Sequence, residues 1–590
     1  MKLTGGALVV RALEDEGIAF AFGIPGTHNI ELYDALAESE RVRTVLVTDE
    51  QSASFMADGV WRATGRMACV NVVPGAGLTH ALSGIAEAFM DNVPMLVLGC
   101  GIRTDSGRAF QLHDIDQAAV VAPVVKEVFR VEEGEDLYAV VRRACRIARA
   151  GAPGPVFVEV PVNLYLFRHE ARDDVVAQSP GEGASNPAGA SVPVRDLVPG
   201  PDPALLQRAA EILRAARRPL IYLGAGAQDA AEAARALAER LEAPVATTIQ
   251  GKGVFPEHHP LFLWPGFGRM APGFVGEIVK ECDATLAVGC RFGEVGTGSY
   301  GLTPPTPLIH VDIDADVLGR NYAAAVALVS DAGAFFTALE GLMGEGGRDP
   351  DEGLRSRILR GHQEVWNTWL ADVGGPGVTP AHLLRTAQRV FGGEAVFTTD
   401  SGNGTFLAME CLRLERPRRF LAPVDYSCMG YAVPAAIGAA LADPECPVVA
   451  LAGDGAFLMT GLEMLTAARE GVGVVALVLR DRELAQIAQF QATAMNRKVA
   501  SEVHDYHLEG MAAGLGIAFL RLDSDEAVGD VLASAEETAR EGRPVLVEVA
   551  IDYSRKTYFT KGVVKTNLHR LPLKDQARFI GRAVLRKVTG

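Results

Sequence analysis

Short apolar, β-branched runs alternate with segments of helical period along most of the chain, and this alternation limits the fold more than any other feature. Two of the runs are TVLV at residues 44–47 and VVAL at residues 448–451. Strands that alternate with helices are typical of parallel sheets covered by helices on both faces. The pattern is interrupted at residues 171–203, which contain SPGEGASNPAGASVP, and at MGEGGRDPDEG, residues 343–353. We therefore predict an α/β fold with three doubly wound parallel-sheet domains.

The two interruptions set the expected domain boundaries. We predict an N-terminal domain at residues 1–171, a central nucleotide-fold domain at residues 203–342, a third domain at residues 365–550 and a basic C-terminal tail at residues 551–590. A chain of 590 residues exceeds the size at which one hydrophobic core keeps growing. In the central segment, PLIYLGAGA at residues 219–227 is typical of a strand that runs into a glycine turn. The full GxGxxG spacing is missing, so the sequence leaves open whether this domain binds a nucleotide or has only a structural role.

The composition favours small-molecule chemistry. Hydrophobic residues make up 48% of the chain and charged residues 22%, as in ordinary globular proteins. The formal net charge of −17 disfavours nucleic acid as a partner. The eight cysteines include no CxxC pair and no histidine at zinc-ligand spacing, so we interpret them as buried thiols of a reducing compartment. The N-terminal apolar run is too short for a signal peptide, and no uncharged stretch is long enough to span a membrane, so we expect a cytoplasmic location.

The most specific local pattern is LAGDGAFLMTGLEMLTAAREGVGVVALVLRD at residues 451–481. A buried strand ends at a Gly-Asp-Gly turn, a helix follows at once, and a second strand, residues 474–479, ends at Arg480-Asp481. In a parallel sheet this returns Asp454 and Asp481 to the same carboxyl edge, where their oxygens can share one cation. The glycines allow a ligand to come close, and the helix N-terminus offers N–H groups to a phosphate. The motif predicts a metal ion with a diphosphate, although an isolated GDG is equally consistent with a helix cap.

This segment resembles the thiamine diphosphate motif of the acetolactate synthase and pyruvate decarboxylase superfamily, which begins with GDG and ends at paired asparagines. The resemblance implies that Mg²⁺ is held by Asp454, Asp481 and the backbone carbonyl of Glu483. It also implies cofactor binding by the turn, which consists of Gly453, Asp454, Gly455 and Ala456. Arg480-Asp481 stands where the family has Asn-Asn. We expect the extra negative charge to weaken cofactor binding unless Arg480 or Arg482 compensates for it.

Three N-terminal blocks resemble acetolactate synthase: FGIPGTHNIELYDAL, VTDEQSASFMADGVWRATGR and VVPGAGLTHALSGIAEAFMDNVPMLVLG. By this resemblance Glu50 is the catalytic glutamate, whose carboxyl group hydrogen-bonds to the pyrimidine ring nitrogen of the cofactor and promotes its imino form. DYSCMGYAVPAAIGAA at residues 425–440 is similar to the family segment that holds the cofactor bent. Met429 is therefore expected under the cofactor, and the carbonyl of Ser427 is expected to accept from its amino group.

The same resemblance implies a substrate pocket. Its residues are Thr27, His28, Phe110, Gln111, Arg291 and Phe490, and Thr27-His28 stands where the synthases commonly have Gly-Ala. Arg291 matches an arginine that contacts substrate or flavin, and Phe490 stands where the family has a tryptophan that helps to select the acceptor. His28 and His113 are candidate proton shuttles, because histidine titrates near working pH, and a structural role is the somewhat better interpretation of each. Asn71 is a weaker candidate of the same kind.

The expected function is thiamine diphosphate- and Mg²⁺-dependent cleavage or formation of a C–C bond next to a carbonyl. In this reaction a 2-oxoacid is decarboxylated and its acyl unit is transferred to a carbonyl acceptor, as in acetolactate synthase. A 2-oxoacid decarboxylase and a C–C hydrolase are alternatives of the same fold, and a non-catalytic nucleotide-binding homologue is the alternative outside enzymes. The resemblance also implies a homodimer or a homotetramer, and it leaves open whether FAD occupies the central domain.

The C-terminal tail differs most from the family. Ten lysines and arginines stand against Asp552 and Asp575 between residues 551 and 590, and ARFIGRAVLRKV has apolar residues that suit one helical face. We expect a last helix packed on its own domain. A lid over the diphosphate and contact with an anionic membrane are alternatives.

Overall fold

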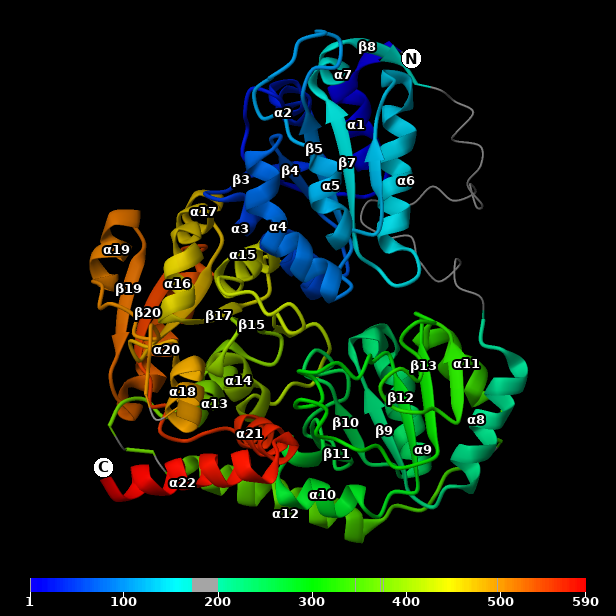
Figure 1. Cartoon of the computed structure of the whole chain (residues 1–590), viewed down its shortest axis with the longest axis vertical. Helices are drawn as coiled ribbons and strands as arrows, with labels where there is room; N and C mark the ends of the chain where they lie inside the picture. Colours follow the sequence, from blue (N-terminus) through cyan, green and yellow to red (C-terminus); the bar gives the residue numbers. More distant parts are fainter. Residues whose placement is uncertain are drawn as a thin grey trace. The chain divides into compact units, whose positions relative to one another are not determined.

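A computed structural model of the chain, drawn in Figure 1, describes residues 2–171, 200–344, 346–371, 373–374, 376–495 and 497–589. Apart from its ends, the linker predicted at residues 171–203 lies outside these residues. The described chain forms two compact units. The first unit contains the described residues of 1–197, 426–445 and 459–474, and the second contains those of 198–425, 446–458 and 475–590.

Three six-stranded sheets confirm the predicted fold class. The first sheet has the order β3 (Arg43–Leu46), β2 (Phe20–Gly23), β4 (Cys69–Val72), β5 (Met95–Gly101), β7 (Pro155–Pro161), β6 (Val128–Arg130). The central sheet has the order β11 (Phe262–Pro265), β10 (Val245–Thr247), β9 (Pro219–Leu223), β12 (Ala284–Val288), β13 (Leu308–Asp312), β14 (Val326–Val329). The third sheet has the order β16 (Phe420–Leu421), β15 (Val396–Thr399), β17 (Val448–Gly453), β18 (Val474–Arg480), β20 (Val545–Ala550), β19 (Ala518–Leu522).

Neighbouring strands of the first two sheets all pair in parallel, as do β15 with β16 and β17, and β20 with β18 and β19. Parallel neighbours need crossover connections, and several of these contain a helix, such as Ala76–Met90 between β4 and β5. A two-stranded antiparallel pair, β1 (Lys2–Thr4) with β8 (Arg168–Glu170), joins the two ends of the N-terminal segment. The predicted domain boundaries stay predictions.

Helices cover the sheets. In the first unit they are α1 (Gly5–Asp15), α2 (Ile30–Ala37), α3 (Glu50–Thr64), α4 (Ala76–Met90), α5 (Gln117–Val121), α6 (Leu137–Arg149), α7 (Val162–Leu166), α15 (Ala432–Ala442) and α17 (Met464–Glu470). In the second unit they include α8 (Pro203–Ala215), α9 (Ala231–Leu241), α10 (Gly273–Val279), α11 (Ala332–Glu340), α12 (Glu352–Leu370), α13 (Pro380–Phe391), α14 (Asn403–Cys411), α18 (Ala485–Met495), α19 (Leu508–Leu515) and α20 (Val528–Arg540). Helix α16 (Asp454–Thr460) contains the boundary between the two units.

Two glycines let α3 and α15 touch through their backbones inside the first unit. A Cβ at Gly59 would lie 2.2 Å from the carbonyl oxygen of Ala435, and one at Gly438 would lie 2.1 Å from the carbonyl oxygen of Met56. Neither position can accept a side chain unless the helices separate. Helix α15 comes from the predicted third domain, yet this contact makes it part of the unit that contains α3 and Glu50.

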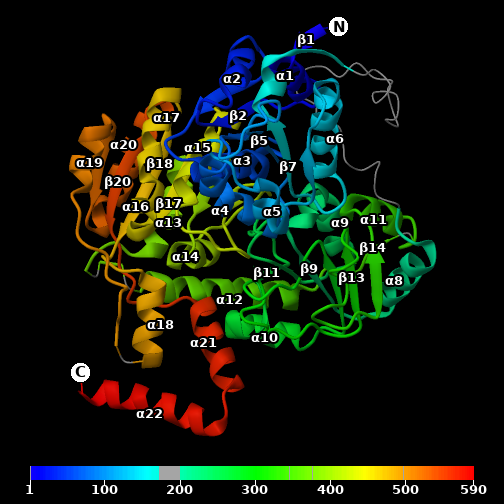
Figure 2. The same cartoon turned by 45° about the horizontal axis from the view of Figure 1, so that its top comes forward.

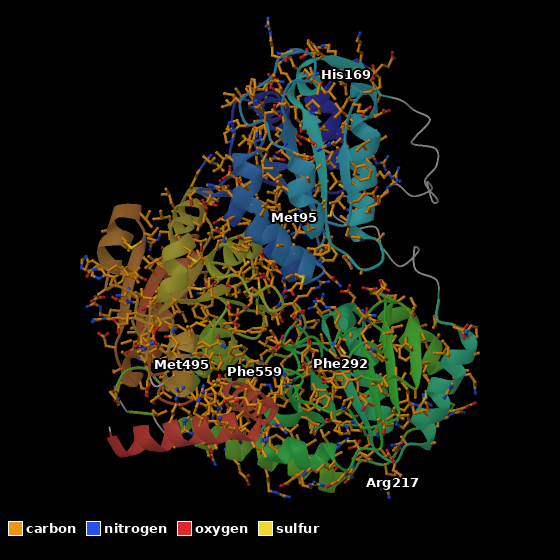
Figure 3. All side chains as sticks on the ribbon, viewed as in Figure 1. Met95, His169, Arg217, Phe292, Met495 and Phe559 are labelled. Atoms are coloured by element: carbon orange, nitrogen blue, oxygen red, sulfur yellow. The ribbon has the colours of Figure 1, made fainter. Side chains whose placement is uncertain are left out.

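The second unit has a continuous core that includes residues of the central and third sheets. Phe292 of the central segment packs against Tyr222 and Tyr322, with ring centroids 5.5 and 5.1 Å apart, and it is labelled in Figure 3. A fully buried ion pair lies at the edge of this core, where the Nζ of Lys252 is 2.7 Å from a carboxylate oxygen of Glu257. The lysine also donates to two backbone carbonyls, so the buried charge is well solvated by the protein.

The tail predicted to be helical forms α21 (Tyr558–Arg570) and α22 (Leu573–Thr589), which Figure 2 shows at the C-terminal end. Helix α21 packs within the second unit, because the ring of Phe559 stacks on Phe406 at 4.0 Å. Helix α22 contacts α18. The apolar side chains predicted for its face lie partly outside the described side chains, which end at residue 582. Among the described residues, no helix combines the length and apolar character needed to cross a membrane.

Candidate active site

The carboxylate of Glu50 lies at the first turn of α3, directly after the loop that follows β3. Asp49 caps the helix, because its side chain accepts a hydrogen bond of 2.7 Å from the N–H of Gln51. The Glu50 side chain is only 10% exposed. It accepts no hydrogen bond from any residue that the structure describes, and Nδ1 of His80 lies 3.6 Å from its Oε2. A Cβ at Gly77 would lie 3.0 Å from its Oε1. Glu50 is therefore a buried acceptor that is available to a ligand.

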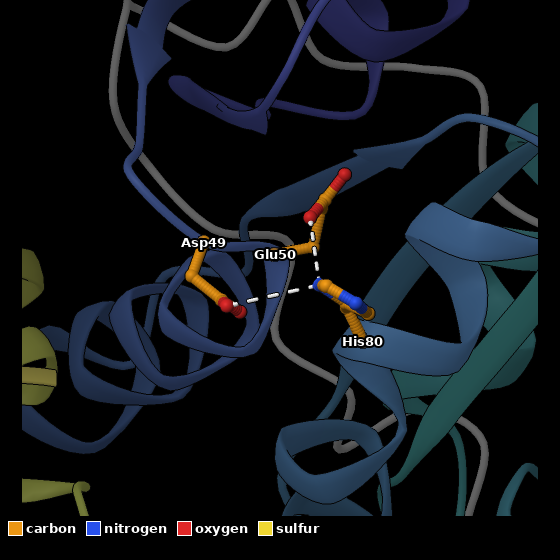
Figure 4. Close-up of side chains that lie close together, drawn as sticks. All are labelled: Asp49, Glu50 and His80. Atoms are coloured by element: carbon orange, nitrogen blue, oxygen red, sulfur yellow. Dashed lines mark ion pairs between the residues drawn. The ribbon is translucent and has the colours of Figure 1, made fainter. Parts of the chain in front are cut away.

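His80 in α4 lies close to both Asp49 and Glu50, as Figure 4 shows. Its Nδ1 is 3.7 Å from Oδ2 of Asp49, and the three ligand atoms of the cluster lie within 4.8 Å of one another. Asp49 and His80 are 44% and 60% exposed, respectively. Two of the three side chains are solvent-exposed, which makes a weak metal site, so we interpret His80 as a polar neighbour of Glu50. Sequence reasoning missed His80, although a polar residue in the helix that follows the PGAG turn is a signal for it.

Ser427 and Met429 lie in the first unit on the loop before α15, and they are exposed and half-buried, respectively. The loop is tied to α4, because the N–H of Cys428 donates to the carboxyl group of Glu87 at 3.0 Å. Burial raises the pKa of Glu87 to about 9, and the charge of Asp91 adds to this shift. A neutral carboxyl group inside the protein thus holds the loop that was predicted to contact the cofactor.

The GDG turn is built as predicted. Strand β17 ends at Gly453, helix α16 begins at Asp454, and the side chain of Asp454 is buried. One carboxylate oxygen of Asp454 accepts from the N–H of Gly455 and the other from the N–H of Arg482, both at 2.8 Å. The second contact joins the ends of the two strands. No atom lies within 4 Å of a Cβ built on Gly453, so there is open space beside the turn.

Asp481 lies close enough to Asp454 for the two carboxyl groups to interact. Burial, and next the charge of Asp454, raise the pKa of Asp481 to about 7. Its Oδ1 accepts from the N–H of Glu483 at 3.3 Å, and the carboxylate of Glu483 forms an ion pair with Lys498. Two partly buried carboxyl groups that repel each other, beside a helix N-terminus, fit a bound divalent cation, because the cation removes the repulsion. Asp454, Asp481 and Glu483 therefore fit the predicted metal site.

The neighbouring arginines are paired elsewhere. Arg480 lies 2.6 Å from Asp505 and 3.4 Å from Glu548, and its guanidinium stacks over the ring of Tyr506 at 4.0 Å. Arg482 pairs with Asp505 at 3.1 Å. The hydroxyl of Tyr506 donates to the carbonyl of Asp454 at 3.2 Å. Burial raises the pKa of Asp454, and the charge of Arg480 opposes that shift. We expected these arginines to offset the negative charge of Asp481. They pair instead with other acidic residues, Asp505 and Glu548.

Of the predicted pocket residues, Thr27, His28, Phe110 and Gln111 are in the first unit. The rings of His28 and His113 meet edge-on with centroids 5.5 Å apart, and Thr27 Oγ1 lies 3.2 Å from His28 Nδ1. Burial, and next the charge of His113, lower the pKa of His28. Phe110 is completely exposed, and the side-chain amide of Gln111 donates to the carbonyl of Arg103 at 2.8 Å.

The two other pocket residues are in the second unit, where Arg291 forms an ion pair with Asp425 and Phe490 is half-buried on α18. Asn71 is completely buried and its Oδ1 accepts from the thiol of Cys69 at 3.3 Å, so it has a structural contact in the first sheet. The structure thus groups Glu50 with Ser427, Met429 and the two histidines in one unit, and the turn residues with Asp481 in the other.

Comparison with protein-family models gives three matches that follow one another along the chain. Residues 3–120 match the N-terminal TPP binding domain of thiamine pyrophosphate enzymes, residues 206–339 match their central domain, and residues 400–549 match their C-terminal TPP binding domain. The order of the three matches is the order of the three sheets.

Curated relatives are similar over nearly the whole chain. The chain is 31% identical to acetolactate synthase from Mycobacterium bovis, with 93% of this chain and 88% of the relative covered. It is 30% identical to a probable acetolactate synthase large subunit from Methanocaldococcus jannaschii, covering 93% and 92%. It is 29% identical to the large subunit of acetolactate synthase isozyme 1 from Escherichia coli, covering 94% and 95%.

Proposed function

Because this chain belongs to the thiamine pyrophosphate enzymes, we propose that it decarboxylates a 2-oxoacid and transfers the acyl unit to a carbonyl acceptor. The matches to both TPP binding domains make it a thiamine diphosphate-dependent enzyme. The relatives named acetolactate synthase support a carboligation. Mg²⁺ and the individual site residues are part of the proposal.

The single observation that carries the proposal is the carboxylate of Glu50, which is 10% exposed and accepts no hydrogen bond from the described residues. When bound, thiamine diphosphate supplies a thiazolium carbon that becomes a nucleophile after loss of a proton. Glu50 would hold a hydrogen bond to the pyrimidine ring nitrogen, and its burial would exclude water from that contact. The carbonyl of Ser427 would accept from the amino group, and Met429 would support the bent cofactor.

The diphosphate end would be held by the GDG turn through Gly453, Gly455, Ala456 and the N-terminus of α16. Asp454, Asp481 and the carbonyl of Glu483 would hold Mg²⁺ with hard oxygen ligands. Burial, and next the charge of Asp454, raise the pKa of Asp481 to about 7, and this supports the set because a cation would neutralise the repulsion between the two carboxyl groups.

A 2-oxoacid decarboxylase is the second candidate, and the contact between His28 and His113 favours it. Burial, and next the repulsion from His113, lower the pKa of His28. This favours the neutral imidazole, which can accept a proton. A proton delivered at the reacting carbon would replace transfer to an acceptor. Thr27, Phe110, Gln111, Arg291 and Phe490 are the other residues proposed to border the substrate.

The test is incubation of the purified protein with thiamine diphosphate, Mg²⁺ and a panel of 2-oxoacids, with and without aldehydes. Carbon dioxide together with a new C–C bond in the product supports carboligation. Carbon dioxide with only an aldehyde as product supports the decarboxylase. No carbon dioxide from any 2-oxoacid contradicts both.

Three further properties belong to the proposal. A homodimer or homotetramer is supported by exposed apolar side chains that follow the GDG turn, Met459, Leu462 and Leu465, which are 57%, 55% and 46% exposed. Light scattering distinguishes the two.

A visible absorption spectrum of the purified protein shows whether FAD is bound. Most of the cysteines are buried, which supports a reducing compartment such as the cytoplasm.

A further inference from the structure

A second buried carboxylate, that of Glu463, contacts the two residues that precede Glu50. Its Oε1 accepts from the N–H of Thr48 at 2.9 Å, from the hydroxyl of Thr48 at 2.5 Å and from the N–H of Asp49 at 3.1 Å. Glu463 has no exposed surface. All three donors lie in the short loop that joins β3 to α3, and all of these residues belong to the first unit.

The segment that carries Glu463 is itself fixed on the first sheet. Glu463 ends the 3-10 turn Gly461–Glu463, and its Oε2 accepts from the hydroxyl of Thr466 at 2.7 Å. One helix further along, Glu470 pairs with Arg43 in β3 at 2.6 Å. The contacts of Glu463 with Thr466 and of Glu470 with Arg43 therefore hold this segment in place, and they set the direction from which the Glu463 carboxylate meets the loop.

The hydrogen bonds between Glu463 and the loop form only when the loop has its native geometry. A buried carboxylate is tolerated only when donors surround it, and a buried N–H needs an acceptor. Burial raises the pKa of Glu463, and hydrogen bonds from Thr48 and Thr466 oppose that shift. Charge-assisted hydrogen bonds of this kind are short and directional. Because the N–H of Asp49 is one residue ahead of Glu50, the contact fixes the place at which α3 begins.

We propose that Glu463 is a positioning residue that holds the Glu50 carboxyl group in the orientation required at the cofactor pyrimidine. This inference rests on the proposed function. Without Glu463, two backbone amides lose their acceptor and the loop relaxes, so Glu50 moves although its own chemistry is unchanged. Binding of the diphosphate is expected to survive, because the hydrogen bonds of Glu463 go to Thr48, Asp49 and Thr466 rather than to the proposed ligands Asp454 and Asp481. The alternative is that Glu463 stabilises the fold and has no effect on the orientation of Glu50.

The first experiment needs no cofactor. Amide hydrogen exchange, read by mass spectrometry on the peptide that contains Thr48 and Asp49, is measured in the apo protein for the parent, Glu463→Ala and Glu463→Gln. We expect exchange at these amides to rise at least tenfold in Glu463→Ala and less in Glu463→Gln, which keeps an acceptor oxygen. Glu470→Ala is the matched control, because it breaks a contact between the same two segments without touching residues 48 and 49. Equal acceleration by Glu470→Ala contradicts the proposal.

The second experiment measures cofactor affinity and proton exchange at the thiazolium carbon of the bound cofactor. We expect Glu463→Ala to bind within threefold of the parent and to exchange at least tenfold more slowly, with Glu463→Gln in between. If Glu463→Ala fails to fold, Thr48→Val replaces it, because this variant removes one donor and keeps the side-chain volume. Proton exchange at the parent rate in the folded variant overturns the positioning role alone. A parent that binds no thiamine diphosphate overturns the proposed function as well.

Discussion

Replacing Glu50 by glutamine removes a negative charge from a side chain that is 10% exposed and keeps its volume. We expect Glu50→Gln to bind thiamine diphosphate and Mg²⁺ nearly as well as the parent, because the diphosphate ligands are untouched. Turnover should fall by roughly 10²- to 10⁴-fold, the usual range for loss of a general acid or base. Proton exchange at the thiazolium carbon measures the affected step directly.

Asp49→Asn is the control for this variant. Asn is as good an N-cap as Asp, so α3 keeps its start while one neighbouring carboxylate is lost. We expect turnover of Asp49→Asn within about threefold of the parent, which is less than 1 kcal/mol. Parent-like proton exchange in Glu50→Gln would show that another group activates the cofactor.

The raised pKa of Asp481, about 7, predicts how Mg²⁺ binding depends on pH. A proton on this carboxyl group competes with the metal ion, so the affinity for Mg²⁺ should increase as pH rises through 7, by up to about tenfold per pH unit. Above the pKa the group is ionised and the affinity should level off. Calorimetric titration with Mg²⁺ in the presence of thiamine diphosphate at pH 6 to 8 measures this dependence.

Two variants isolate the contribution of each aspartate. Asp481→Asn cannot be protonated and carries no charge, so its Mg²⁺ affinity should be independent of pH across this range. At pH 8 it should bind the cofactor as well as the parent or better, because the repulsion from Asp454 is gone. Asp454→Ala should abolish Mg²⁺-dependent binding. Binding of Asp481→Asn that is at least tenfold weaker at pH 8, about 1.4 kcal/mol, would mean that the aspartate charge is required.

At the scale of elements, helix α21 depends on a buried carboxyl group. Glu410 in α14 accepts a hydrogen bond of 3.0 Å from the N–H of Phe559 in the first turn of α21. Burial raises the pKa of Glu410 to about 8. The unfolded group ionises near pH 4.5, so its contribution is fully present below that pH and is lost as pH rises to about 8. We expect α21 to be held less firmly at pH 9 than at pH 6.

Amide hydrogen exchange over Tyr558–Arg570 at the two pH values, corrected for the intrinsic effect of pH, tests this. Glu410→Gln cannot ionise and should remove the excess exchange at the higher pH. Helix α1, in the first unit, serves as the internal reference. If α21 in the parent and in Glu410→Gln responded to pH in the same way, the carboxyl group would not control the docking of the helix.

At the scale of the whole molecule, similarity to acetolactate synthases covers nearly all of the chain, whereas Thr27, His28, Asp481 and Phe490 differ from the family pattern near the proposed site. The cofactor performs the common early chemistry, so differences of this kind change specificity. We expect decarboxylation of at least one 2-oxoacid, with a favoured acceptor other than a second pyruvate. Assays with pyruvate alone test the choice of acceptor. Acetolactate formed at about 10 per second would contradict it.

Local patterns in the sequence were sufficient to predict some of the elements. The GDG turn at the end of β17 and the helix that begins at Asp454 are where the pattern placed them. These features depend on neighbours a few residues away, because a strand that ends in glycine and a helix that starts at a capping residue are determined by backbone preferences and short hydrogen bonds. The resemblance to a known family added the roles of single residues.

The three parallel sheets and the candidate carboxylates of the site could be predicted from the sequence alone. Three contacts became visible only in the folded chain: Glu463 holds the loop before Glu50, α15 packs on α3 through two glycines, and Arg480 pairs with Asp505. The residues of the first contact are 414 positions apart in the chain. Strands and helices follow from interactions along the chain, whereas the partner of a buried charge follows from how the elements pack, and no local pattern encodes that choice.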